Sequence, residues 1–278
     1  MDPSGEALVS KDAVVTMLGT GLKFVEGPVW IEKESKLVFS DIPASQLMQW
    51  TAAGGVAPLR PSQGANGNTL DGEGRLVTCQ HAGRNVIRTE KDGTTTVLAE
   101  AFEGKKLSSP NDVTVAKDGT VWFTDPHYGL KKEDKKETEG NWVYRLDPAS
   151  KKLTVVSREF DMPNGLAFSP NGKRLYIADS GKPQRVGAFD VKADGTLSPA
   201  VFWTEGGADG IRVDVKGNLY TTAGDGVRIY NPEGKQIALI SLPEKPANCA
   251  FGGADFQTLF VTARTSLYSI PLKVAGSR

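Results

Sequence analysis

A unit of about 40–50 residues recurs six times along the chain, and this repetition constrains the fold more than any other feature. Each copy has a short alternating strand, a turn rich in Gly, Asp or Asn, and a second strand rich in Val, Leu, Tyr, Phe and Thr. This order is typical of a β-hairpin. The successive spacings are 40, 45, 53, 45 and 39 residues, and the longest interval contains a charged insert at 131–140. The copies begin near Glu26, Asn66, Asn111, Asn164, Asp209 and Asn248.

Two further strand-like segments follow each of the first five hairpins, whereas the sixth copy lacks the last one. A strand-like segment at 13–25 precedes the first copy and can complete the sixth. No segment sustains apolar residues at helical spacing. The pattern predicts an all-β, six-bladed β-propeller that is closed by an N-terminal strand completing the last blade. Residues 13–278 would form this single domain and residues 1–12 an N-terminal tail. A two-sheet sandwich is the alternative, and it leaves the period unexplained.

The charge composition argues against a polyanionic partner. Lys and Arg number 33 and balance 33 Asp and Glu, so we expect binding neither to nucleic acid nor to a membrane. Charged residues near the N-terminus replace the apolar stretch of a signal peptide, and no apolar run approaches the roughly 18–20 residues of a membrane helix. We therefore expect a soluble protein, cytoplasmic or periplasmic, and a monomer or weak homodimer. Cys79 and Cys249 are interpreted as buried apolar residues rather than as a disulfide.

Acidic and amide residues open the first strand of every unit. In a propeller these strands line the central channel, so their first residues meet at one mouth. Turn formation is an alternative reason for Asn and Asp, above all for Asn66 and Asn248. It does not explain Glu26, because a carboxylate near the channel axis must be paired, protonated or metal-bound. Oxygen donors that include two carboxylates favour one divalent cation, Ca²⁺ first and Mg²⁺ or Mn²⁺ next; Zn²⁺ is least favoured because it recruits His or Cys.

Several motifs occur in order between about Phe24 and Leu272: EGPVW, SPNDV followed by FTDPHYG, PNGLAFSPNGKRLYIADS, GGADGIRVDVKGNLY and FGGADFQTLFVTARTSLYSI. They resemble the bacterial members of the gluconolactonase family, which includes regucalcin (senescence marker protein) and is related to diisopropyl fluorophosphatase-like hydrolases. The resemblance implies a calcium-dependent propeller that hydrolyses sugar lactones or related esters. It also implies metal contacts by Glu26, Asn164 and Asp209, and a metal or substrate contact by Asn111.

Two positions depart from this resemblance. Regucalcin-like members carry an Arg, which helps to hold a sugar lactone, where this chain has Ser109. Bacterial members usually read DPPYG, whereas this chain has His127 in place of the second proline. We interpret His127 either as a substrate contact or as an exposed loop histidine.

Loops that follow the second strands should return to the same mouth. Among their residues, Tyr128 is a candidate substrate contact, and the guanidinium groups of Arg84 and Arg264 suit a substrate carboxylate. Asp179 and Asp225 are equally suited to capping backbone groups. The insert at 131–140 leaves from this mouth and is either a solvated loop or a lid. The complete set at this mouth is Asp41, His81, Arg84, Asp125, His127, Tyr128, Asp179, Asp225 and Arg264.

The resemblance, together with these residues, leads us to expect a metal-dependent hydrolase that opens a sugar lactone or a related small ester at the channel mouth. Asp209 is the candidate general base, provided that one of its oxygens binds the cation and the other faces water. Asn111 is the second catalytic candidate. A non-catalytic, metal-stabilised propeller that binds sugar or protein remains an alternative, as does a phosphotriester-type hydrolase that uses the same ion. Only two histidines and no GxSxG motif occur, which argues against a serine triad.

Overall fold

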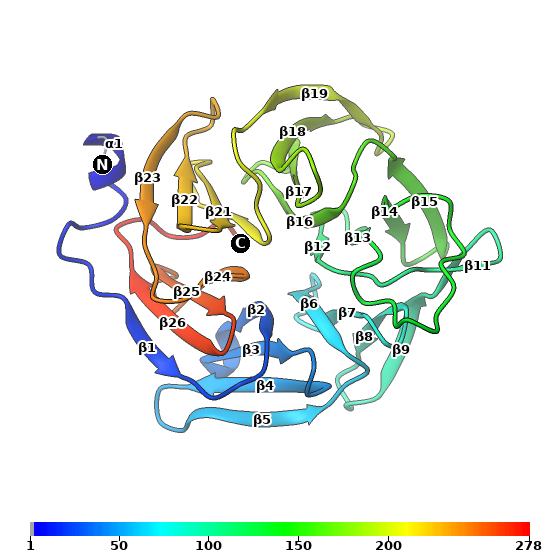
Figure 1. Cartoon of the computed structure of the whole chain (residues 1–278), viewed down its shortest axis with the longest axis horizontal. Helices are drawn as coiled ribbons and strands as arrows, with labels where there is room; N and C mark the ends of the chain where they lie inside the picture. Colours follow the sequence, from blue (N-terminus) through cyan, green and yellow to red (C-terminus); the bar gives the residue numbers. More distant parts are fainter. Residues whose placement is uncertain (1–2) are drawn as a thin grey trace.

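The protein is a ring of six four-stranded antiparallel sheets around a central channel (Figure 1), in a computed structural model that describes residues 3–278. Strands that follow one another in the chain are neighbours in each sheet, so every blade is a meander. Among residues 3–278, no helix has both the length and the apolar composition needed to span a membrane. The predicted all-β, six-bladed propeller is confirmed.

The first three blades take the chain from Val25 to Ser157, each beginning at the channel. Blade 1 comprises β2 (Val25–Ile31), β3 (Lys36–Asp41), β4 (Gln46–Thr51) and β5 (Gly55–Pro61). Blade 2 comprises β6 (Ala65–Leu70), β7 (Leu76–Gln80), β8 (Asn85–Thr89) and β9 (Thr95–Ala99). Blade 3 comprises β12 (Val113–Val115), β13 (Val121–Asp125), β14 (Trp142–Asp147) and β15 (Lys152–Ser157). A small hairpin that the sequence did not predict joins blades 2 and 3, formed by β10 (Ala101–Phe102) and β11 (Lys105–Lys106).

The last three blades close the ring. Blade 4 comprises β16 (Pro163–Phe168), β17 (Arg174–Asp179), β18 (Arg185–Val191) and β19 (Leu197–Trp203). Blade 5 comprises β20 (Ile211–Val213), β21 (Leu219–Ala223), β22 (Gly226–Tyr230) and β23 (Gln236–Ile240). Blade 6 comprises β24 (Asn248–Gly252), β25 (Thr258–Ala263), β26 (Ser266–Pro271) and, as its outer strand, β1 (Thr16–Gly19). Because β1 pairs with β26, both ends of the chain contribute to one sheet, and the ring closes as predicted.

Apolar side chains are buried between neighbouring blades rather than in one central core. Trp30 of blade 1 stacks on Phe260 of blade 6 with ring centroids 5.4 Å apart. Tyr220 and Phe251 meet edge to face between blades 5 and 6 at 5.0 Å. Such aromatic pairs add about 0.5–1.5 kcal/mol beyond the area they bury. Cys79 and Cys249 are free and buried among these side chains, which confirms their interpretation as apolar residues.

The regular pairing of the inner strands is interrupted next to the polar residues at the channel mouth. The ladder between the first and second strands changes register in blades 1, 2 and 4, at Glu26–Val29, Ala65–Asn68 and Pro163–Leu166. A bulge of this kind redirects a side chain and ends regular pairing. A glycine follows the polar residue in each of these blades, because the next blade approaches closely: a Cβ on Gly27 would lie 2.0 Å from the carbonyl oxygen of Asn66.

Hydrogen bonds between blades fix the inner ends of these strands around the channel. The N–H of Gly67 donates to the carbonyl of Asn111 at 2.8 Å. Gly165 makes the same contact two blades further on, with the carbonyl of Asp209 at 2.7 Å. A hydroxyl on the second strand adds a further bond, as where Thr124 donates to the carbonyl of Asn164 at 2.8 Å. The local sequence thus holds the polar residues in one ring.

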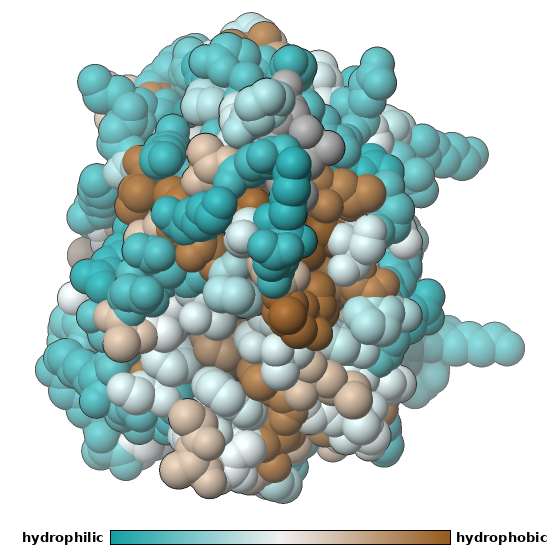
Figure 2. All heavy atoms as spheres, turned by 90° about the vertical axis from the view of Figure 1, so that its left-hand side faces the viewer, coloured by the Kyte–Doolittle hydropathy of each residue, from teal (hydrophilic) through white to brown (hydrophobic). Residues whose placement is uncertain are grey.

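The two ends of the chain also pack on the propeller. The segment assigned to an N-terminal tail forms α1 (Pro3–Glu6) and then buries Leu8 and Val9 against blades 5 and 6. Figure 2 shows this side of the molecule, where hydrophilic side chains surround a strip of apolar ones. The C-terminal residues run toward the centre of the ring (Figure 1), and the N–H of Ser277 donates to the carbonyl of Val213 at 2.9 Å.

Candidate functional site

The residues expected at the channel mouth lie together where the inner strands begin. Glu26 is in β2 and Asn164 is in β16, while Asp209 precedes β20 by two residues. The side chain of Asn164 hydrogen-bonds to Asp209, and the charge of Asp209 acts on Glu26. Asn111 precedes β12 and is buried in the same ring. The structure therefore places Glu26, Asn164 and Asp209 near one another, with Asn111 at the start of the inner strand of blade 3.

The carboxylates at this mouth carry poorly compensated negative charge. Burial raises the pKa of Glu26 well above its usual value, and the charges of Asp209 and Asp112 raise it further. Burial also raises the pKa of Asp209 to about 6, although Lys245 and the hydrogen bond from Asn164 oppose that shift. Buried carboxylates that repel one another in this way are stabilised by a cation.

Asp112 is a member of this cluster that the sequence analysis did not identify. It is 1% exposed, and its Oδ2 accepts a hydrogen bond from Nδ2 of Asn248 at 3.4 Å. A guanidinium nitrogen of Arg212 lies 3.6 Å from the same oxygen. The signal was present in the sequence, because Asp112 occupies the position after the ring residue where four other blades have glycine.

Two further side chains reach the mouth from surrounding loops. The hydroxyl of Tyr128 interacts with Ser180 and Asn164, and its pKa is raised by burial and by the charge of Asp209. The role of Tyr128 as a substrate contact stays a prediction. Lys245, an exposed residue before β24, acts electrostatically on Asp209. No sequence pattern singled out Lys245, because its position depends on how the link between blades 5 and 6 is folded.

Three of the aspartates at the ends of second strands anchor loops. Asp41 accepts hydrogen bonds from the backbone N–H groups of Lys23 and Phe24, and Asp179 accepts them from Asp161 and Met162. Asp125 does the same for the segment that leads into Asn111. Asp179 therefore caps backbone N–H groups, which is one of the two roles that its sequence position suggested. Asp225 instead forms an exposed ion pair with Arg228 at 3.0 Å.

Replacement of Asp125 tests this anchoring role. Its two oxygens accept the N–H groups of Ser108 and Ser109, both at 2.8 Å, in a fully buried setting that raises its pKa to about 7. We expect Asp125→Ala to lower the free energy of unfolding by about 2–4 kcal/mol, because two buried donors lose their acceptor. Urea denaturation measures the change. Asp225→Ala, which removes an exposed ion pair, should cost less than about 1 kcal/mol; equal losses for the two variants would refute the anchoring role.

The other three residues predicted to bind substrate, Arg84, His127 and Arg264, make contacts with the protein itself. Arg84 uses its guanidinium within the fold, where Nε donates to the carbonyl of Leu107 at 2.7 Å and Nη2 to that of Lys135 at 3.3 Å. His127 is exposed, and its Nδ1 lies 3.0 Å from Oδ1 of Asn141. Arg264 is exposed, and its carbonyl accepts the N–H of Val25 at 2.8 Å, so its backbone lies next to Glu26.

Ser109 and the charged insert at 131–140 both form hydrogen bonds that hold neighbouring loops together. Ser109 is buried; its hydroxyl donates to the carbonyl of Pro126 and accepts the N–H of Gly129, which ties the loop before Asn111 to the loop after β13. The insert at 131–140 is held down by contacts of Arg84 with Lys135 and Glu137, and by Thr138 against Ser108 at 3.0 Å. It therefore packs over the connection between blades 2 and 3.

A buried pair next to the ring is formed by Asn66 and His81. Nδ2 of Asn66 lies 3.0 Å from Nε2 of His81, and Oδ1 of Asn66 has no hydrogen-bond partner within residues 3–278. Burial lowers the pKa of His81 to about 4, so the imidazole is neutral at pH 7 and accepts from the amide. Asn66 thus presents a buried, oriented and unpartnered acceptor oxygen at the mouth.

The depressed pKa of His81 predicts a specific dependence of stability on pH. The unfolded chain takes up a proton near pH 6.5, whereas the folded protein does so near pH 4. The stability is therefore fully present above pH 6.5 and is lost as the pH falls toward 4. We expect the free-energy difference between wild type and His81→Gln to change by about 2 kcal/mol between pH 7.5 and pH 5. Urea titrations at both pH values measure it; a difference independent of pH would contradict a buried neutral His81.

Fold and site together define a six-bladed propeller whose polar centre, rich in carboxylates and amides, lies at one mouth of the channel. Residues 24–265 match the protein family described as "SMP-30/Gluconolactonase/LRE-like region". The chain belongs to this family, which confirms the resemblance seen in its motifs.

Similar proteins of known name agree with this assignment. A gluconolactonase from Zymomonas mobilis subsp. mobilis is 30% identical to this chain, over 99% of this chain and 85% of the relative. A pentonolactonase from Haloferax volcanii is 27% identical, over 90% of this chain and 84% of the relative. The structure of a gluconolactonase from Xanthomonas campestris superposes with a TM-score of 0.91 at 34% identity, covering 98% of this chain and 93% of that one.

Proposed function

We propose that this chain hydrolyses the ester bond of a sugar lactone at the mouth that carries Glu26 and Asp209. The observation that carries this proposal is a pair of mutually repelling carboxylates, the buried Glu26 and the half-buried Asp209, within a ring of amide side chains. Relatives named gluconolactonase and pentonolactonase support sugar lactones as the substrate class. Both the substrate and the solvent can reach this end of the channel, since Asp209 is half-buried and Tyr128 is 44% exposed.

The donors at this mouth fit a hard divalent cation. Glu26, Asp209, Asn164 and Asn111 offer only oxygens, and the charge of the two carboxylates needs compensation. Within residues 3–278 no three His, Cys, Asp or Glu side chains form a metal cluster, so the proposed set mixes carboxylates with amides. We assign Ca²⁺ first, Mg²⁺ or Mn²⁺ next and Zn²⁺ last. Bound there, such a cation would polarise the lactone carbonyl as a Lewis acid.

The side chains of the site supply the remaining steps. Asp209 takes a proton from water while the water oxygen attacks the carbonyl carbon of the lactone. The bond between that carbon and the ring oxygen then breaks, and the ring oxygen receives the proton, so a hydroxy acid is released. Asn111 donates its amide N–H to the substrate. Oδ1 of Asn66 accepts a hydrogen bond from a substrate hydroxyl, and Tyr128 covers the site beside Asn164.

Proton release from lactones tests this proposal. Purified protein should accelerate acid production from glucono-1,5-lactone and from a pentonolactone above the spontaneous rate, measured at constant pH. Treatment with a chelator should remove the acceleration, and added Ca²⁺ should restore it. Turnover that persists after chelation would refute the role of the cation. Hydrolysis of a fluorophosphate ester without hydrolysis of any lactone would replace the proposal by the phosphotriester alternative, and no turnover on either class would favour a binding protein.

A further inference from the structure

A cavity lies where the inner strands end, and neither Glu26 nor Asp209 lines it. It has a volume of about 490 Å³ and is lined by the far ends of the inner strands, among them Leu70, Val115, Phe168 and Val213. The C-terminal residues Ser277 and Arg278 also line it. We call this space the rear cavity. Its size lies within the range of about 300–1,000 Å³ that small-molecule sites occupy.

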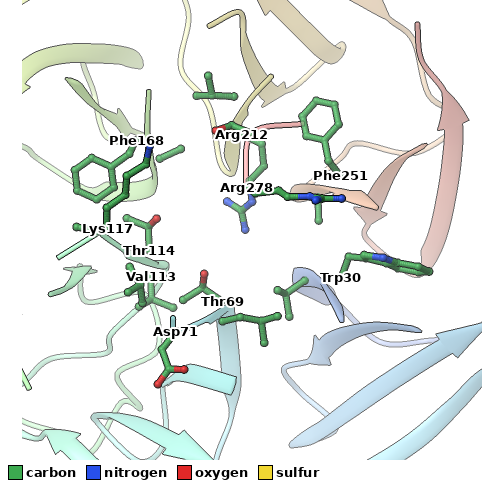
Figure 3. A pocket seen from close by; sticks show the side chains of 18 of the residues that line it. Trp30, Thr69, Asp71, Val113, Thr114, Lys117, Phe168, Arg212, Phe251 and Arg278 are labelled. Atoms are coloured by element: carbon green, nitrogen blue, oxygen red, sulfur yellow. The ribbon is translucent and has the colours of Figure 1, made fainter. Parts of the chain in front are cut away.

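The walls of the rear cavity are mostly apolar. Val29, Leu70 and Val113 line it beside the aromatic rings of Trp30, Phe168 and Phe251. Figure 3 shows Arg212 and Arg278 extending into the space that these side chains surround. Apolar walls with a few charged groups are typical of sites for organic ligands.

Positive charge in the rear cavity is incompletely balanced. The acidic residues at its edge are already paired, Glu32 with Arg278 at 3.1 Å and Asp71 with Arg75 at 2.8 Å. Arg212 is only loosely paired: Nη1 donates to the carbonyl of Ile211 at 2.7 Å and lies 3.6 Å from the carboxylate of the buried Asp112.

The other donors of this guanidinium are free to bind a ligand. Within residues 3–278 the Ile211 carbonyl is the only hydrogen-bond acceptor of the Arg212 side chain, although a guanidinium has five N–H donors. The side chain is only 19% exposed. A planar, half-buried guanidinium with spare donors is suited to a carboxylate, which it can bind through two parallel hydrogen bonds.

We propose that the rear cavity binds a small organic carboxylate with an apolar body, whose carboxylate pairs with Arg212 and whose body contacts the aromatic and aliphatic walls. Neither Glu26 nor Asp209 lines the rear cavity, so it is a site separate from the lactone site, and its occupancy does not depend on lactone hydrolysis.

Calorimetric titration with 3-phenylpropanoate tests the proposal on the full chain. We expect saturable binding of one molecule, and binding of the uncharged 3-phenylpropanamide at least about tenfold weaker, because the charge-assisted hydrogen bonds are lost. Arg212→Met should weaken binding of the acid by about tenfold or more and leave that of the amide unchanged. Arg174→Met, which removes an arginine paired with Asp190 on the surface, is the matched control and should bind like wild type.

A second variant separates loss of binding from loss of folding. Thr114 lines the cavity, so Thr114→Phe should fill part of it and abolish binding of both probes without abolishing cooperative unfolding. Absence of saturable binding by the wild type would overturn the proposal. Equal affinity for acid and amide, or binding that Thr114→Phe leaves unchanged, would also overturn it.

Discussion

Asp209→Asn is expected to lower kcat/KM for lactone hydrolysis by about 10²–10⁴-fold, the contribution typical of a general base. The amide cannot take a proton from water, yet it can keep the hydrogen-bonded position beside Asn164. The variant should therefore fold normally and retain part of its affinity for Ca²⁺. Initial rates at constant pH, with saturating Ca²⁺, give the change.

The matched control for this variant is Asp225→Asn. Asp225 follows the second strand of the same blade, but it is exposed and pairs with Arg228, so its replacement should leave kcat/KM within about twofold of wild type. Calcium titrations show whether each protein still binds the cation. Full activity of Asp209→Asn with Ca²⁺ bound would remove Asp209 from the chemistry.

Glu26→Gln should weaken Ca²⁺ binding by about 100-fold, because it removes one of two full charges from the proposed ligand set. The same change should leave the metal-free protein at least as stable as wild type. In the wild type the Glu26 carboxylate is buried close to Asp209 and Asp112, and this environment raises its pKa. Calorimetric Ca²⁺ titration and thermal unfolding in chelator measure the two effects.

Weaker Ca²⁺ binding together with unchanged or higher stability of the metal-free protein distinguishes a cation ligand from a residue that stabilises the fold. Glu34→Gln is the control, because that carboxylate is exposed and pairs with Lys36 at 2.7 Å on the turn after β2. It should change neither quantity. Unaltered Ca²⁺ affinity in Glu26→Gln, or a large loss of stability in the metal-free protein, would show that Glu26 does not serve as a cation ligand.

The fold could be predicted from the sequence because each blade is specified locally. The alternation of strand residues, the glycine turns and the regular period all lie within single units of the chain. The ring of polar residues followed from the same reasoning, since Glu26 and Asn164 hold equivalent positions in their blades. Closure by β1 followed from counting strands, as the sixth unit lacked one.

The rest of the site depends on contacts that no local pattern encodes. Lys245 reaches Asp209 through the fold of a loop between blades, and Arg84 has its guanidinium engaged by the carbonyls of Leu107 and Lys135. A side chain at the right mouth can therefore be a structural element rather than a substrate contact. Asp112 was detectable in principle, as the residue that replaces glycine in the repeated pattern.

An anomalous diffraction experiment on crystals soaked in Mn²⁺ tests the proposed cation site, because Mn²⁺ replaces Ca²⁺ at oxygen sites and gives a strong signal. We expect one dominant peak at the channel mouth, within bonding distance of carboxylate oxygens from both Glu26 and Asp209. No peak there, or a dominant peak elsewhere on the molecule, would contradict it.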